Sequence, residues 1–260
     1  MDGLPFSDVR LIHRRGAIEI LAAVDRSGRD VIIKRLVPER CRPDPLGVAR
    51  FRREVAIHQT LHHPGVARCF GSGEGWLALE LLQNGLDDPV RRPGFRQSSA
   101  VLTLLRDLAE TLAYLHARGV IHADLKPAHI MFRGDRPVII DFGIAALGSR
   151  DPIAGAEFAG SPRWMAAELI AGGLPSPASD VQALCAIGCW LLNGAPDCDE
   201  HAAAILERRL RSGNASEAEM TLPAGIDRQL ARILEAGVGP QNLRPTAAQI
   251  VQLISRTTAG

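Results

Sequence analysis

Residues 120–145 constrain the fold most, because this stretch places two aspartates shortly after apolar runs. Asp124 follows the first run closely, and Asp141 comes directly after the second. Between the two aspartates, two short apolar segments flank Gly-Asp-Arg-Pro at residues 134–137, which predicts a tight β-hairpin. A hairpin at this place would bring the two carboxylates back towards one another.

The charged residues of this stretch suit the transfer of a phosphoryl group. Lys126 stands two residues after Asp124 and adds a positive charge at the same place. One carboxylate could accept a proton while that of Asp141 holds a cation. Phosphoryl transfer depends on positioning and charge neutralisation more than on covalent chemistry. The alternative is that both aspartates only cap ordinary turns.

Two motifs in this stretch resemble those of a known family. The sequence H-A-D-L-K-P-A-H at residues 122–129, followed by D-F-G at 141–143, resembles the catalytic loop and the metal-binding motif of protein kinases. The resemblance covers nearly the whole chain and points to bacterial serine/threonine kinases. It implies an α+β fold with two lobes, a small antiparallel sheet with helix C and a mainly helical larger lobe. We expect residues 1–82 to form the nucleotide-binding lobe, and residues 83–260 to carry the catalytic loop, the activation segment and the helices.

Length and composition fit one catalytic unit. The chain has 260 residues, of which 46% are hydrophobic and 23% charged, so it can bury a sizeable core. A net charge of +1 gives no reason to expect nucleic acid as a partner. The five cysteines lack paired C-x-x-C spacing, which favours a reducing compartment. No apolar run reaches membrane-spanning length, so we expect no membrane insertion and a cytoplasmic location.

Lysine is almost absent from this chain. Of thirty basic residues twenty-eight are Arg, and only Lys34 and Lys126 are Lys. Both fall where a kinase needs a compact ammonium group rather than a guanidinium fork. Codon bias explains why lysine is scarce, but it does not explain where the two lysines stand.

The first eighty residues supply the expected nucleotide site. V-I-I-K, ending at Lys34, resembles the third-strand V-A-I-K motif, which implies that Lys34 holds the phosphates of ATP. Glu54, in a helical pattern over residues 45–61, resembles the helix C glutamate that orients this lysine. By the same resemblance, the nucleotide site is lined by Gly16, Lys34, Leu79 as gatekeeper, Glu80, Leu82 and Asp141.

The glycine-rich loop of the family, G-x-G-x-x-G-x-V, is missing. His13, Arg15 and Ile18 stand at its glycine positions, and Gly16 is out of register. Glycines matter there because backbone N–H groups must approach the phosphates closely. The cradle is either lost or replaced by the side chains of Arg14 and Arg15, unless these two arginines form an ordinary solvated turn.

The second half of the chain carries further matches. G-S-P-R-W-M-A-A-E at residues 160–168 resembles the end of an activation segment. The resemblance implies a Ser161 hydroxyl bonded to the catalytic Asp and Lys, and a buried ion pair of Glu168 with Arg244. It also implies that Asp180 anchors the catalytic loop. The remaining structural positions in the two motifs are His122 and Phe142.

Two substitutions depart from the family motif. Ala123 replaces the arginine that docks an activating phosphate, so control through a phosphorylated activation loop is not expected. His129 replaces the asparagine that holds the second metal, and imidazole suits Mg²⁺ poorly. Either one metal ion on Asp141 suffices, or His129 joins Asp141 around a nitrogen-tolerant ion such as Mn²⁺. The alternative is that His129 is a loop histidine that binds no metal. Lipopolysaccharide sugar kinases also resemble this pattern with His at that position, so His129 alone does not indicate an inactive protein.

These observations predict a serine/threonine protein kinase that uses ATP with Mg²⁺ or Mn²⁺ and phosphorylates a Ser or Thr of a protein. Asp124 would be the catalytic base, assisted by Lys126, Lys34 and Glu54, and Asp141 would bind the metal. One alternative is a pseudokinase that binds or scaffolds with little or no turnover. Another is a small-molecule or lipopolysaccharide sugar kinase.

The periodicity also predicts individual elements. Apolar spacing indicates a helix from residue 98 or 99 to 117, capped by Ser98 or Ser99. Gln83-Asn84-Gly85 reads as a turn between the lobes. Further helices are expected over residues 180–193, 200–211, 226–236 and 246–256.

Overall fold

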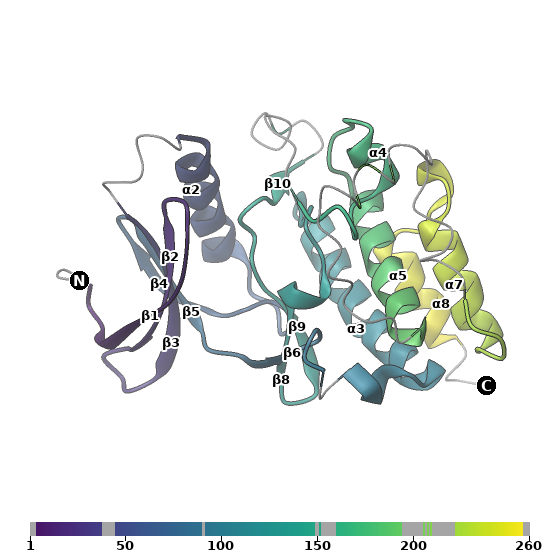
Figure 1. The fold of residues 1–260 in the computed structure, drawn as a ribbon, viewed down its shortest axis with the longest axis horizontal. Coiled ribbons are helices and arrows are strands. Elements are labelled where there is room, and N and C mark those ends of the chain that lie inside the picture. The colour runs from purple at the N-terminus through teal and green to yellow at the C-terminus, as the bar shows by residue number, and fades with distance from the viewer. Residues whose placement is uncertain are drawn as a thin grey trace.

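A five-stranded antiparallel sheet forms the first lobe. The computed structural model describes residues 4–37, 45–89, 92–148, 151, 160–193, 222–256 and positions 205, 207 and 209. The strands are β1 (Ser7–Arg15), β2 (Ile18–Val24), β3 (Asp30–Leu36), β4 (Cys69–Gly73) and β5 (Trp76–Glu80). They lie in the order β1-β2-β3-β5-β4, and helix α2 (Pro45–Thr60) lies beside the sheet (Figure 1).

Alternation along β2 and β3 gives this sheet two different faces. Leu21 lies opposite Ile33, and both are buried in a small core with Phe6 and Trp76, whose rings meet edge to face. Successive side chains of a strand point to opposite faces. Lys34 therefore lies on the other face, opposite Ile20 on the neighbouring strand.

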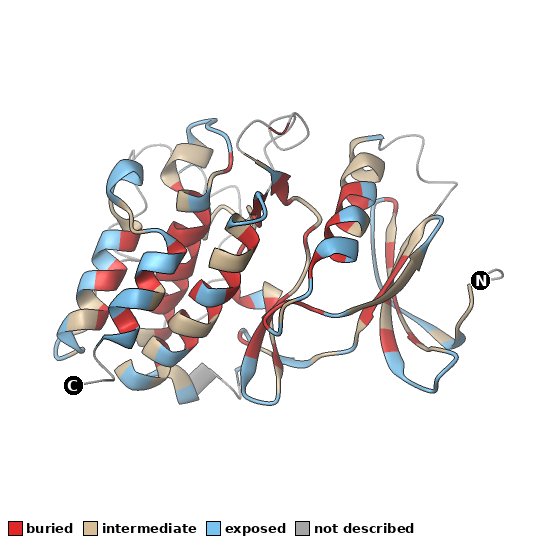
Figure 2. Cartoon of the chain, turned by 180° about the vertical axis from the view of Figure 1, so that it is seen from behind, coloured by how far each residue is buried: buried red, intermediate tan, exposed pale blue. Residues whose placement is uncertain are grey.

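The larger lobe is mainly helical, so the predicted α+β class with two lobes is confirmed. Its helices are α3 (Ser98–His116), α4 (Ala167–Ile170), α5 (Pro177–Asn193), α7 (Arg228–Val238) and α8 (Ala247–Ser255), with 3-10 turns at Arg92–Phe95, Pro127–His129 and Gln241–Leu243. Buried residues run through the centre of this bundle (Figure 2). No helix in the described ranges is both long and apolar enough to cross a membrane.

The predicted stripe on α3 forms part of this core. Its members are all buried, namely Val101, Leu104, Leu105, Leu108, Leu112 and Leu115. Cys185 and Cys189 on α5 are buried free thiols, and burial raises the pKa of Cys189 to about 12. Both cysteines therefore act as small apolar core residues.

The predicted cap of α3 is wrong. The cap residue is Gln97, which makes no side-chain cap hydrogen bond, and Ser98 and Ser99 are already inside the helix. The Ser98 hydroxyl instead accepts from the backbone N–H of Asp227, the cap of α7. The Ser98 hydroxyl is therefore engaged in a tertiary contact with α7 and does not cap α3. The predicted helices near 180–193, 226–236 and 246–256 are confirmed, and that at 200–211 lies almost wholly outside the described residues.

A second correction concerns Gln83–Gly85, which is the short strand β6 rather than a turn. It pairs with β8 (Ile130–Arg133), and β9 (Arg136–Ile139) is the third strand of this sheet, in the order β6-β8-β9. The register is irregular between Gln83 and Gly85, where Asn84 has φ 61°. β5 belongs to the small-lobe sheet and β6 to this one. A lobe boundary at residues 82 and 83 stays a prediction.

The predicted hairpin between the two aspartates is confirmed. β8 pairs with β9 (Arg136–Ile139) across a two-residue turn, Gly134 and Asp135, where Gly134 has φ 62°. The turn is shorter than predicted, because Arg136 and Pro137 belong to β9. Just beyond the open end, the N–H of Ile140 donates to the carbonyl of His129 at 3.0 Å. This bond holds residue 141 next to the 122–129 loop.

Candidate active site

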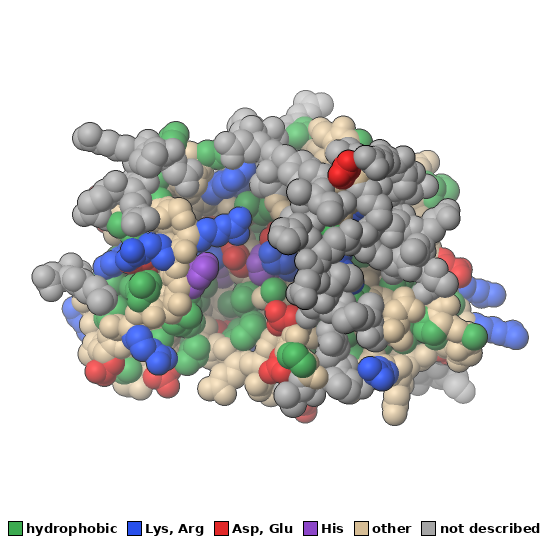
Figure 3. Space-filling model, viewed as in Figure 1, with side chains coloured by type: hydrophobic (Ala, Val, Ile, Leu, Met, Phe, Trp, Pro, Cys, Tyr) green, Lys and Arg blue, Asp and Glu red, His purple; other side chains and the backbone are tan. Residues whose placement is uncertain are grey.

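A buried ammonium group joins three elements between the lobes. Lys34 Nζ on β3 donates to Glu54 Oε1 on α2 at 2.5 Å and to Asp141 Oδ1, after β9, at 2.8 Å. Burial alone would lower the pKa of Lys34, but the two carboxylates outweigh it and raise that pKa above its ordinary value. Charged and histidine side chains gather where the lobes meet (Figure 3).

Asp141 lies at the mouth of this cluster, with its side chain 37% exposed. Its backbone takes φ 64°, and its Oδ1 accepts from the N–H of Gly143 at 3.0 Å. Burial favours the neutral acid, but Lys34 prevails and holds the pKa of Asp141 below its usual range. Asp141 is thus a partly open, negatively charged group with its second oxygen, Oδ2, directed away from the lysine.

Phe142 fills the space behind the charged cluster. It is fully buried, and its ring centroid lies 5.1 Å from that of His58 and 5.2 Å from that of His122. Its N–H also donates to Glu54 Oε1 at 3.2 Å. Phe142 therefore ties the segment after β9 to α2 by both packing and a hydrogen bond.

Asp180 on α5 fixes the backbone at the start of the 122–129 loop. Its carboxylate accepts from the N–H groups of His122 and Ala123, each at 2.9 Å, and lies 2.9 Å from His116 Nε2. Ala123 has φ 66°, a left-handed conformation that disfavours a residue with a Cβ. The two bonds from a buried carboxylate hold the loop in that conformation.

His122 adds a second set of bonds to this loop. Its Nε2 lies 3.1 Å from the carbonyl of Ile140, and its Nδ1 accepts from the N–H of Asp124 at 3.3 Å. A carbonyl can only accept, so Nε2 carries the proton of that hydrogen bond, while Nδ1 acts as an acceptor. His122 thus connects the loop that carries Asp124 to the strand end that carries Asp141.

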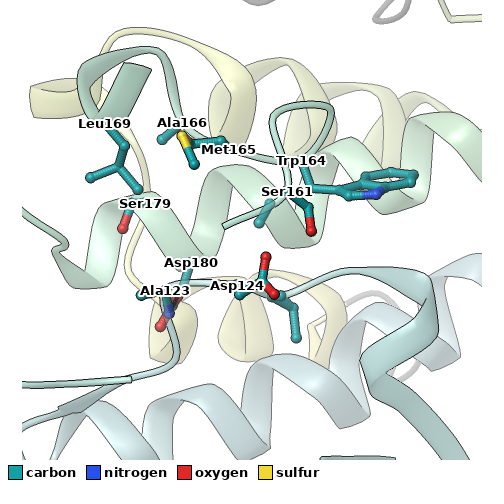
Figure 4. A pocket seen from close by; sticks show the side chains of 11 residues that line it. Ala123, Asp124, Ser161, Trp164, Met165, Ala166, Leu169, Ser179 and Asp180 are labelled. Atoms are coloured by element: carbon teal, nitrogen blue, oxygen red, sulfur yellow. Dashed lines mark hydrogen bonds between the residues drawn. The ribbon is translucent and has the colours of Figure 1, made fainter. Parts of the chain in front are cut away.

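Asp124 and Ser161 line a small pocket, and Lys126 contacts both of them. Lys126 Nζ lies 3.1 Å from Asp124 Oδ2 and donates to Ser161 Oγ at 2.8 Å. Figure 4 shows Asp124 and Ser161 facing one another across this pocket of about 10 Å³. Gly160 has φ 124°, and a Cβ there would lie 2.8 Å from Met165 Cε and 3.6 Å from Asp124 Oδ1. The contact with Asp124 would be an ordinary one, so it is the positive φ that favours glycine at this position.

His129 lies between the two aspartates. Its Nδ1 is 2.9 Å from the carbonyl of Asp124, and its Nε2 is 3.6 Å from Asp141 Oδ2. Burial lowers the pKa of His129 to about 4, against the opposite pull of Asp141 and Asp124. The ring is therefore neutral at pH 7, with its proton on Nδ1 and a lone pair on Nε2 directed at Asp141.

The β1–β2 turn differs from a glycine-rich loop. Arg15 pairs with Ile18, so only Gly16, with φ 56°, and Ala17 form the turn. Arg14 Nε donates to Glu19 Oε1 at 2.8 Å, and Glu19 is buried and also bonded to Arg35. The Arg14–Glu19–Arg35 row lies on the face opposite Lys34, because strand neighbours alternate.

The residues expected around adenine lie at the end of β5 and just after it. Leu79 is buried and packs with Phe51 of α2. The Glu80 carboxylate accepts from the N–H of Arg68 at 2.8 Å and pairs with Arg133. The N–H of Glu80 donates to the carbonyl of Arg68 at 2.9 Å, so its carboxylate and its N–H are both already bonded within the protein. Leu82 is half-buried in the connection between the lobes.

Glu168 and Arg244 form a bidentate pair. Arg244 Nη1 lies 2.5 Å from Glu168 Oε1, and Nη2 lies 3.0 Å from Oε2. Arg244 also donates to the carbonyls of Gly239 and Ala178. The pair connects Glu168, at the end of the 160–168 segment, to the chain just before α8.

Sequence reasoning missed two buried polar residues beside this site. His58, four residues after Glu54, was not singled out, although that spacing places both on one face of α2. Arg53 was missed as well, and it pairs with Asp151 at 2.6 Å. Nothing local distinguishes Arg53 from the many other arginines of this chain.

The comparisons with known proteins give the family. The protein kinase domain model matches residues 17–253, and the chain belongs to this family. Serine/threonine-protein kinase PknA of Mycobacterium tuberculosis is 34% identical over 199 residues, covering 71% of this chain and 46% of that protein. PknB of Mycobacterium leprae is 26% identical over 259 residues, covering 94% and 42%. Pkn2 of Myxococcus xanthus is 30% identical over 185 residues, covering 66% and 22%. The chain spans less than half the length of each of these relatives.

The burial of His58 makes stability depend on pH. Burial and the nearby Lys34 lower the pKa of His58 from 6.5 to about 3. The unfolded chain then binds this proton more readily, so stability is full above pH 6.5 and is lost as pH falls towards 3. At pH 5 the loss is about 2 kcal/mol. We expect His58→Leu to lack this loss in urea unfolding at pH 7.5 and pH 5, and the exposed-site variant His62→Ala to keep it. Equal pH slopes for wild type and His58→Leu would show that His58 is not buried as a neutral ring.

Proposed function

We propose that this chain is a serine/threonine protein kinase that transfers the γ-phosphoryl group of ATP to a protein hydroxyl. The observation that carries the proposal is the convergence of five charged groups between the lobes. Lys34 bonds to Glu54 and Asp141, and Lys126 lies within 3.1 Å of Asp124. His129 connects the two clusters.

The nucleotide would lie along β3 and the connection after β5. Lys34 would bind the α- and β-phosphates, and Glu54 would keep its ammonium group in place. Leu79 would border the adenine, and the backbone from Glu80 to Leu82 would offer hydrogen-bonding groups to its edge. In this arrangement the terminal phosphate would lie towards Asp141 and Lys126.

Asp124 would act as the base that receives the proton of the acceptor hydroxyl. The acceptor oxygen bonds to the transferred phosphorus while the bond from that phosphorus to the leaving ADP breaks, and the hydroxyl proton moves to Asp124. Lys126 would neutralise charge on the transferred group, since it already lies against Asp124 and Ser161. The chain thus supplies positioning and charge, the two things that this reaction requires.

A single divalent cation fits between Asp141 and His129. Asp141 Oδ2 and the lone pair of His129 Nε2 face each other at 3.6 Å, and a shared cation would satisfy both. No group of three or more His, Cys, Asp or Glu suited to a metal occurs in the described ranges. Phosphate oxygens and water would complete the coordination, as is usual for Mg²⁺ sites with nucleotides. When bound, the ion supplies charge neutralisation at the phosphates, and the imidazole nitrogen favours Mn²⁺ over Mg²⁺.

A pseudokinase is the second candidate, and the β1–β2 turn favours it. A turn of Gly16 and Ala17 offers few backbone N–H groups to phosphates. A small-molecule or sugar kinase is the third candidate. Arg244 bonds to Glu168 and so holds the 160–168 segment in place. A fixed segment beside Asp124 offers a surface for a peptide, which supports a protein substrate instead.

The first test is phosphoryl transfer itself. With Mn²⁺ and labelled ATP, we expect the purified protein to label itself or a generic protein substrate. Asp124→Asn should reduce the rate roughly 10²- to 10⁴-fold, because the general base is lost. Asp135→Asn, at an exposed acid in the β8–β9 turn, is the matched control and should keep the rate. ATP turnover without labelled protein would support the small-molecule reading, and nucleotide binding without turnover would support the pseudokinase.

The second test concerns the cation. We expect His129→Leu to weaken Mn²⁺ binding in the presence of ADP roughly tenfold, as loss of a ligand or its support does at metal sites. The free Mn²⁺ signal in electron paramagnetic resonance measures this affinity without any turnover. His62→Leu, at an exposed histidine, should leave it unchanged. An unchanged affinity in His129→Leu would remove this residue from the site.

The third test separates the two turn arginines. Arg15 pairs across from Ile18 on the face that carries Lys34, whereas Arg14 is engaged with Glu19 on the other face. We expect Arg15→Ala to raise the Kd for ATP about tenfold, the usual scale for a lost charged hydrogen bond, and Arg14→Ala to change it much less. Isothermal titration with ATP gives both values. Equal effects of the two substitutions on the Kd would contradict the proposal that Arg15, and not Arg14, contacts the phosphates of ATP.

A further inference from the structure

A buried ion pair outside the proposed mechanism joins α2 to the activation segment. Arg53 Nη1 lies 2.6 Å from Asp151 Oδ2, and each side chain is only 6% exposed. The two residues are 98 positions apart in the sequence. A contact of this kind helps to fix the relative position of two segments that are far apart in the sequence.

Only one of the three guanidinium nitrogens of Arg53 has a hydrogen-bond partner among the described residues. Arg53 Nε and Nη2 are buried and have no hydrogen-bond partner among the residues that the structure describes. Asp151 therefore supplies a negative charge beside a buried guanidinium. Removal of one partner from a buried pair leaves an uncompensated charge, which disrupts the structure far more than loss of an exposed pair does.

The same carboxylate reaches a second element. Asp151 Oδ2 also accepts from the N–H of Leu147 at 2.8 Å. Leu147 ends β10 (Ala146–Leu147), which pairs with β7 (Val120–Ile121) directly before His122. One oxygen atom thus connects α2 to the strand pair that leads into the 122–129 loop.

We propose that Arg53 and Asp151 form a latch that positions Glu54 against Lys34. Arg53 precedes Glu54 on α2, so a helix released from Asp151 can move its glutamate away from the lysine. Both latch residues are positioning residues, since neither touches the groups around Asp124. The consequence for phosphoryl transfer rests on the proposed function, whereas the effect on Lys34 does not.

The scarcity of lysine makes this effect directly measurable. Lys34 and Lys126 are the only two lysines, so an amine-reactive reagent reports on just these side chains and the N-terminus. Glu54 Oε1 lies 2.5 Å from Lys34 Nζ and limits the access of a reagent to it. We expect Asp151→Asn and Arg53→Met to raise the labelling rate of Lys34 several-fold relative to Lys126, because an amine released from Glu54 is more open to the reagent.

Two variants serve as controls. Arg53→Lys keeps a positive charge that can still reach Asp151, and it should preserve the wild-type labelling ratio. Arg52→Met removes the exposed neighbouring arginine from the same helix and should also preserve it. In the active protein, kcat/KM for ATP should fall in the two latch variants in proportion to the rise in labelling.

The outcomes separate this proposal from the proposed function. An unchanged labelling ratio in folded Asp151→Asn, with only a lower Tm, would make the pair merely structural and overturn the latch. Raised labelling in a chain without kinase activity would support the latch and contradict the kinase. Should both latch variants fail to fold, hydrogen exchange in the wild type decides. Slow exchange at the Leu147 amide supports the bond to Asp151, and exchange at the rate of free chain overturns it.

Discussion

The buried ammonium group of Lys34 is the constraint on which the rest of the structure depends. It lies on a strand of the small sheet, and its two carboxylate partners come from α2 and from the segment after β9. An ammonium removed from water is unfavourable unless its partners are correctly placed. The three elements must therefore meet in one arrangement. That arrangement also places Phe142 between His58 and His122, and it leaves the second oxygen of Asp141 available beside His129.

Carboxylates also hold the backbone geometry around Ala123 and Asp141. Ala123 and Asp141 both take left-handed conformations, which cost about 1–2 kcal/mol for residues other than glycine. The buried carboxylate of Asp180 accepts two N–H groups around Ala123, and Asp141 itself accepts the N–H of Gly143. Charge-assisted bonds to these carboxylates offset the strain. Asp124 and Asp141 are thereby held on either side of the neutral imidazole of His129.

Local patterns predicted much of this arrangement, and long-range pairing accounts for what they missed. The α3 stripe and the β8–β9 hairpin follow from periodicity and turn residues, and the lysine pair follows from motif matches. Gln83–Gly85 became a strand only because β8 lies beside it, and the Ser98 hydroxyl left its helix end for Asp227. Arg53 resembles every other arginine in a chain that uses little else for positive charge. Its partner comes from 98 residues away, so no window of sequence could have revealed it.

The central claim is that Lys34 is a buried, doubly paired ammonium group placed to meet a nucleotide. Nitrogen-15 labelling of lysine gives two side-chain signals, since the chain has two lysines. Their titration with pH, followed by addition of a non-hydrolysable ATP analogue, tests the claim directly. We predict that Lys34 titrates above the ordinary lysine pKa and that its signal shifts when the analogue binds. An ordinary pKa for Lys34, together with a signal indifferent to the nucleotide, would contradict the account.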